Sequence, residues 1–108
     1  GKQLDGYCKD ICDMGDIRLK FEDFGWYAQD VDGHDIEAIV HAVQSAKKVT
    51  GKPSMIVLHT EKGKGCSFTE GVFFNHHVKF TRAQADEAIA ALEKKLTRSG
   101  EEGEKLCQ

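Results

Sequence analysis

The chain has 108 residues, of which 40% are hydrophobic and 31% charged, and its formal net charge is −3. This length supports one small domain, and the charge balance gives no basic field for nucleic acid. No uninterrupted apolar stretch, Met55–Leu58 included, approaches the length needed to span a membrane. We therefore expect a soluble cytoplasmic protein without a nucleic-acid or membrane partner.

The amino-terminal third predicts a helix followed by a strand. Three apolar residues with helical spacing predict a first helix over residues 16–24, and Gly25 follows it as a natural helix end. The three apolar residues are Ile17, Phe21 and Phe24. Residues 26–31 are then expected to form a short strand.

A second helix and a second strand follow. Four apolar residues mark one face of a helix that begins after Gly33 and is stopped before Pro53. These residues are Ile36, Ile39, Val40 and Val43. Residues 54–60 are apolar at four consecutive positions, which is typical of a parallel strand covered on both faces.

The last predicted element is a third helix. Thr81 and Gln84 have the spacing of a capping box, and an apolar stripe continues from them to an end near Gly100. The stripe consists of Ala85, Ala88, Ile89, Leu92 and Leu96. We expect residues 1–98 to form one domain and residues 99–108 to form a polar, loosely held tail.

The order helix, strand, helix, strand, helix predicts an α/β domain with a parallel sheet. Two parallel strands cannot hide both of their faces from water, so we expect the domain to be incomplete. The elements that would cover the exposed faces of the sheet must come from further chain or from a partner. Unpaired strand edges and uncovered apolar faces also predict an oligomer.

The cysteines leave two interpretations open. Cys8 and Cys12 stand one helical turn apart, and with His76 and His77 they could ligate a metal ion. Structural zinc sites usually show paired short spacings, which this sequence lacks. Free, reduced thiols are therefore the preferred interpretation.

The segment Lys62–Phe68 carries the strongest functional signal. It places two lysines and two glycines after the apolar strand, and a histidine pair follows at His76 and His77. Loops after parallel strands lie at the carboxyl edge of the sheet, where open α/β folds bind ligands. An ammonium neutralises phosphate, an imidazole can donate to it, and glycines allow close backbone approach. The pattern predicts a polyanion site.

Five blocks in this order resemble transketolase, specifically the carboxyl portion of its amino-terminal, thiamine diphosphate-binding half. The blocks begin at Gln3, Lys20, Val31, Lys62 and His76. They read Gln-x-Asp-Gly, Lys-Phe-x-x-Phe-Gly-Trp, Val-Asp-Gly-His-Asp, Lys-Gly-Lys-Gly-x-Ser-Phe-x-Glu, and the single histidine. The resemblance extends from Gly1 to about Leu96.

The resemblance implies a transferase of the pentose phosphate pathway that moves a two-carbon ketol unit between sugar phosphates. It implies thiamine diphosphate and Mg²⁺ as cofactors, and a dimer or a partnership with the carboxyl-terminal transketolase half. By position, Lys62, Gly63 and Gly65 would bind the cofactor, and His76 would be catalytic. The main-chain carbonyl of Lys2 would bind the metal.

The chain also departs from the family pattern. The Gly-Asp-Gly signature of cofactor binding is absent, and Asn75 and His77 replace the Trp and Gly that flank the family's histidine. We therefore expect a fragment of a transketolase subunit that is inactive on its own. One alternative is a non-catalytic α/β interaction or scaffold module. Another is kinship with deoxyxylulose phosphate synthase.

Overall fold

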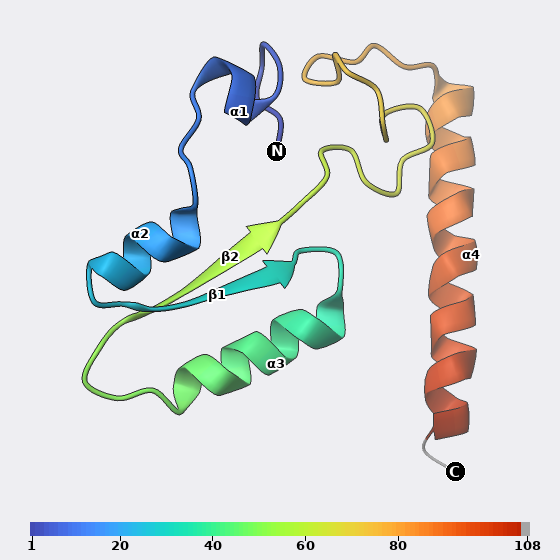
Figure 1. Ribbon diagram of the computed structural model, residues 1–108. Helices are drawn as coiled ribbons and strands as arrows, with labels where there is room; N and C mark the ends of the chain where they lie inside the picture. Colours follow the sequence, from blue (N-terminus) through green and yellow to red (C-terminus); the bar gives the residue numbers. More distant parts are fainter. Residues whose placement is uncertain (107–108) are drawn as a thin grey trace. The chain divides into compact units, whose positions relative to one another are not determined.

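The computed structural model describes the backbone of residues 1–106 and the side chains of residues 1–96. Its elements are α1 Cys8–Ile11, α2 Ile17–Asp23, β1 Tyr27–Asp32, α3 Ile36–Lys47, β2 Ser54–His59 and α4 Arg82–Leu106 (Figure 1). The predicted order is confirmed, with the short α1 as an unpredicted addition. The chain divides into two compact units, Gly1–Glu61 and Lys62–Gln108, and each is described by itself.

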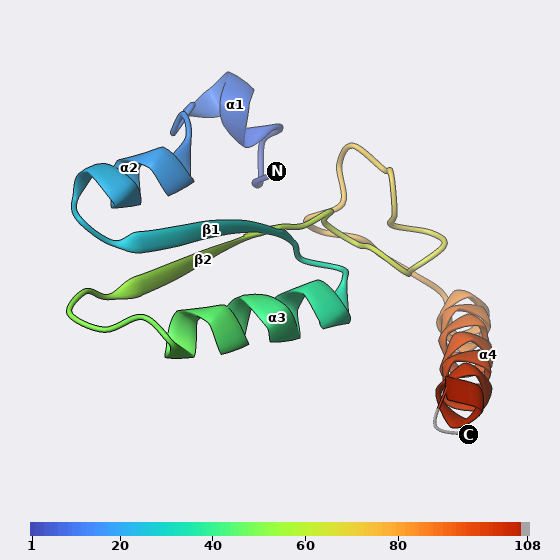
Figure 2. The same cartoon turned by 60° about the horizontal axis from the view of Figure 1, so that its bottom comes forward.

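The first unit is built on a two-stranded parallel sheet. β1 pairs with β2 in a register that runs from Tyr27 opposite Ser54 to Asp32 opposite His59. α3 connects the two strands, as parallel pairing requires a crossover. α2 and α3 pack on opposite faces of this sheet (Figure 2). The predicted α/β class with a parallel sheet is therefore confirmed.

Aspartates begin both longer helices of the first unit. The carboxylate of Asp16 accepts a hydrogen bond from the Leu19 amide at 2.8 Å, and that of Asp35 accepts one from the Ala38 amide at 2.9 Å. Such caps satisfy amides that have no partner within the helix. α2 ends before Gly25, whose φ of +84° is a conformation that glycine adopts easily.

The core of the first unit is small. Ala28, Val31 and Ala42 are buried, whereas Leu58 in β2 is 45% exposed. The other apolar residues of β2 are only half-buried, so the prediction of a strand covered on both faces was wrong for the described part of the chain. The physical reason is that a sheet of two strands is too narrow for one helix per face to exclude water. The finding agrees with an incomplete domain.

The second unit consists of a loop and α4. Thr81 and Gln84 form the predicted capping box, with the Thr81 amide donating to Gln84 Oε1 and the Gln84 amide donating to Thr81 Oγ1. α4 continues to Leu106, so the predicted end near Gly100 was wrong. The Glu and Lys residues beyond it favour helix, whereas an interior glycine disfavours it by only about 1 kcal/mol. The side chains of the predicted tail, residues 99–108, lie outside the described residues.

Three further features concern the cysteines, a possible metal site and a possible membrane-spanning helix. Cys8, Cys12 and Cys66 are free thiols, and Cys107 lies outside the described residues. No three His, Cys, Asp or Glu side chains among those described gather as a group that could hold a metal ion. None of the described helices combines the length and the apolar character needed to cross a membrane.

Candidate functional site

The loop after β2 turns through two glycines that the sequence predicted as cofactor contacts. Gly63 and Gly65 have φ values of +84° and +85°, a region that other residues rarely adopt. A Cβ at Gly63 would lie 2.7 Å from Thr69 Oγ1, and one at Gly65 would lie 3.4 Å from Leu92 Cδ2 of α4. Gly63 thus lets the loop approach itself closely, and Gly65 borders α4.

Lys62 and His76, the two residues predicted to matter most, are in contact. They stand 14 residues apart in the sequence, yet Lys62 Nζ lies 2.9 Å from His76 Nδ1. An ammonium can only donate, so Nδ1 accepts this bond and the imidazole proton resides on Nε2. The ring of His77 lies edge-on to that of His76, with centroids 4.7 Å apart.

Asn75, which sequence reasoning noted only as a departure from the family, closes the loop behind this pair. Its Nδ2 donates to the main-chain carbonyl of Lys62 at 2.9 Å and to that of Thr69 at 3.0 Å. The side chain is half-buried. In the sequence, the one signal that could have identified Asn75 was its position next to His76. Its two carbonyl contacts depend on how the loop folds back, which no local pattern specifies.

Glu70 holds the middle of the loop. One carboxylate oxygen accepts from Lys64 Nζ at 2.6 Å, and the other accepts from the Gly65 amide at 2.8 Å. The bond from Lys64, followed by that from Gly65, lowers the pKa of Glu70 below its ordinary value. Lys64 therefore forms an ion pair with Glu70 within the loop, whereas Lys62 contacts His76.

The lowered pKa of Glu70 predicts how the loop responds to acid. Because the folded pKa lies below the unfolded one, the stabilisation is present above the ordinary glutamate pKa and is lost as the pH falls through the folded value. An NMR titration should show the Gly65 amide resonance moving over that acidic range. In the control Glu70→Gln this movement should disappear. A Gly65 resonance that titrates equally in both proteins would contradict the assignment.

Lys2 lies in the first unit, apart in sequence from the loop. It forms an antiparallel bridge with Tyr7, and its Nζ lies 5.7 Å from the centre of the Tyr7 ring, within cation–π range. The proposed metal contact concerns its main-chain carbonyl, and this role stays a prediction.

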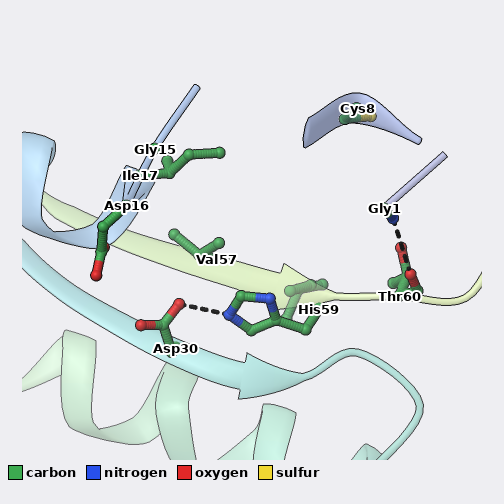
Figure 3. A pocket seen from close by; sticks show the side chains of 10 residues that line it. Gly1, Cys8, Gly15, Asp16, Ile17, Asp30, Val57, His59 and Thr60 are labelled. Atoms are coloured by element: carbon green, nitrogen blue, oxygen red, sulfur yellow. Dashed lines mark hydrogen bonds and ion pairs between the residues drawn. The ribbon is translucent and has the colours of Figure 1, made fainter. Parts of the chain in front are cut away.

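The first unit contains a cavity of about 600 Å³ beside the carboxyl half of β2. Residues that line it include Cys8, Ile17, Asp30, Val57, Leu58 and His59. Figure 3 shows His59 and Asp30 joined across the two strands, with His59 Nε2 at 2.6 Å from Asp30 Oδ1. Arg18 contacts the other carboxylate oxygen of Asp30 at 2.9 Å.

Two histidines outside the loop make hydrogen bonds near the carboxyl ends of the two strands. His59 is satisfied by Asp30, although its side chain is 66% exposed and so belongs to the edge of the sheet and not to the core. His34 Nε2 accepts a hydrogen bond from the Glu61 amide at 2.7 Å and thereby links the ends of β1 and β2.

Comparison with known proteins decides the family. Residues 3–102 match the family described as transketolase, thiamine diphosphate binding domain. The chain belongs to this family. The resemblance drawn from the five sequence blocks is therefore confirmed, and the two-stranded α/β unit is a fragment of the thiamine diphosphate-binding fold.

Several curated transketolase proteins are similar to this transketolase domain. The 6-deoxy-6-sulfo-D-fructose transketolase subunit of a Clostridium species is 47% identical over 92 residues, which cover 85% of the chain and 34% of that protein. An apulose-4-phosphate transketolase subunit of Phocaeicola vulgatus is 29% identical over 94 residues, which cover 87% of the chain and 34% of that protein. Transketolase of Sinorhizobium medicae is 42% identical over 77 residues, which cover 71% of the chain and 10% of that protein. The chain spans about a third of the length of the first two of these relatives.

Proposed function

We propose that this chain is part of a transketolase subunit that transfers a two-carbon ketol unit with thiamine diphosphate. In this proposal Lys62 and His76 form an anion site for the cofactor's diphosphate and the reacting sugar. The observation that supports it most directly is the 2.9 Å contact between Lys62 Nζ and His76 Nδ1. Membership of the thiamine diphosphate-binding family supports the choice of cofactor.

The pair presents hydrogen-bond donors and positive charge to a ligand. An ammonium has three N–H groups, so two remain on Lys62 after the bond to His76, and the imidazole adds its Nε2–H. Phosphate oxygens accept such charge-assisted bonds strongly. Because Lys64 is held by Glu70, the second lysine of the loop does not compete for this role.

Thiamine diphosphate, when bound, supplies the carbanion chemistry that ketol transfer needs. The chain's own residues would bind and orient it. Gly63 and Gly65 permit the positive-φ turns of the loop that carries Lys62, and the Lys62 ammonium would neutralise phosphate charge. His76 Nε2 would donate to a sugar or phosphate oxygen and exchange a proton there. For Mg²⁺, this chain would contribute the main-chain carbonyl of Lys2.

The partners follow from the part of the enzyme that this chain represents. It spans about a third of its subunit relatives, and its sheet faces are only partly covered. We propose that the rest of the domain and the carboxyl-terminal transketolase half, on a second subunit, complete the site. The 47% identical relative is named for a sulfonated ketose, so a sugar sulfonate is a second candidate substrate beside the sugar phosphates.

Ketol transfer by the complete subunit, mixed with its carboxyl-terminal half, tests this function against the scaffold alternative. We expect turnover of a ketose phosphate or of 6-deoxy-6-sulfo-D-fructose that depends on added thiamine diphosphate. The preferred donor identifies the substrate class. If neither donor is turned over although the cofactor is present, the scaffold interpretation replaces the enzyme.

A further inference from the structure

Asn75 connects three parts of the loop that carries the Lys62–His76 pair. Its two amide hydrogens go to the carbonyls of Lys62 and Thr69, at 2.9 and 3.0 Å. An amide nitrogen has two hydrogens, so both donors are used within the loop. The side chain is half-buried, and hydrogen bonds shielded from water are stronger electrostatically. One residue therefore fixes the backbone at the start and middle of the loop, directly before His76.

The contact between Lys62 and His76 depends on this backbone geometry. His76 is exposed, and lysine has a long flexible stem, so ordering the two side chains against each other loses conformational entropy. Asn75 directly precedes His76, and its side chain binds the main-chain carbonyl of Lys62. It therefore holds the backbones of Lys62 and His76 close together, which reduces that loss. The side chains then need to search less space to reach their 2.9 Å contact.

Thr69 extends the same network to the glycine after Lys62. Its carbonyl accepts from Asn75, and its hydroxyl donates to the Gly63 carbonyl at 3.2 Å. The backbone is thus held at Lys62 by Asn75 and at Gly63 by Thr69. Neither contact uses an atom that the proposed ligand would bind.

We propose that Asn75 is a positioning residue of the anion site. Its two hydrogen bonds hold the loop in the shape that brings Lys62 and His76 into contact, so that both can face the phosphate groups of cofactor and sugar. This proposal rests on the proposed function, since it assigns the pair to those ligands. Asn75 acts through Lys62 and His76, because its own donors point to main-chain carbonyls.

Asn75→Asp tests the proposal with little change in shape. It removes both donors and sets a carboxylate against two carbonyl oxygens. In the complete subunit with its carboxyl-terminal half, we expect the Kd for thiamine diphosphate to rise about ten-fold, the scale of one net hydrogen bond. We also expect the ¹⁵N NMR signals of the His76 imidazole to change, because Nδ1 loses its donor. Asn75→Ala should change both quantities in the same direction without adding charge.

Ser67→Asp is the matched control. It adds the same charge to an exposed position of the same loop and leaves both Asn75 bonds in place. Asn75→Gln keeps the donors on a longer side chain and should recover part of the affinity. Wild-type His76 signals and wild-type affinity in both Asn75→Asp and Asn75→Ala would overturn the proposal.

The experiment separates this proposal from the proposed function. Lys62→Ala and His76→Ala serve as references in the same titration. If they weaken cofactor binding and the Asn75 variants do not, the positioning role fails alone. If they leave cofactor binding unchanged, the proposed function fails, and the His76 imidazole signals still decide whether Asn75 orders the pair.

Discussion

His76→Ala is expected to lower kcat for ketol transfer in the complete enzyme by about 100-fold or more, the scale of a lost general acid–base group. The reason is the assignment of protons at the site. Lys62 donates to Nδ1, so Nε2 holds the proton and is the atom that can exchange it with a sugar oxygen. Removing the imidazole also removes the acceptor that orients the Lys62 ammonium.

The measurement is steady-state ketol transfer at saturating sugar and cofactor, which isolates kcat from cofactor affinity. His41→Ala is a suitable control, because that side chain is 69% exposed on α3 and lies in the other unit. His77→Ala tests the neighbouring ring, which packs against His76 and should have a smaller effect. A His76 variant that keeps the wild-type kcat would remove His76 from the catalytic residues.

Gly63→Ala is expected to disrupt the proposed anion site through the backbone. Alanine is strained at a φ of +84°, and its Cβ would lie 2.7 Å from Thr69 Oγ1 and 3.0 Å from the Thr69 carbonyl oxygen. The loop must shift to relieve this contact, and Lys62 shifts with it. We expect a loss of unfolding free energy above about 1 kcal/mol and a rise of about ten-fold or more in the Kd for thiamine diphosphate.

Gly71→Ala provides the matched control for this prediction. Gly71 also has a positive φ, of +75°, but a Cβ there would have no neighbour within 4 Å. The control therefore carries the backbone strain without the clash, and it should leave cofactor affinity near the wild-type value. Equal effects of the two substitutions, measured by denaturant unfolding and cofactor titration, would show that the close approach at Gly63 does not matter.

The elements of the fold could be predicted from sequence because their signals are local. Asp16 and Asp35 begin helices through contacts three residues away, and Thr81 does the same with Gln84. The end of α4 was missed because Gly100 was given more weight than the helix-forming residues after it. The burial of β2 could not be read from its apolar run, since burial depends on neighbours that the described chain does not supply.

Sequence alone could name Lys62 and His76 as candidates but could not predict the contact between them. Lys62 and His76 came from the family resemblance, and no spacing rule connects residues 14 positions apart in a loop. The contacts of Asn75 and Glu70 depend on how the loop closes on itself, which glycines at positive φ permit but do not specify. The Asp30–His59 contact likewise follows from the register of β1 and β2, which sequence patterning left open.

The central claim is that Lys62 and His76 act as one anion site, and a double-mutant cycle on thiamine diphosphate affinity tests it most directly. The Kd would be measured for the complete enzyme and for Lys62→Ala, His76→Ala and the double variant. We predict that each single substitution weakens binding and that the double variant is weakened by clearly less than the product of the two effects, because each residue orients the other. Independent effects that simply multiply, or unchanged affinity in all three variants, would contradict the account.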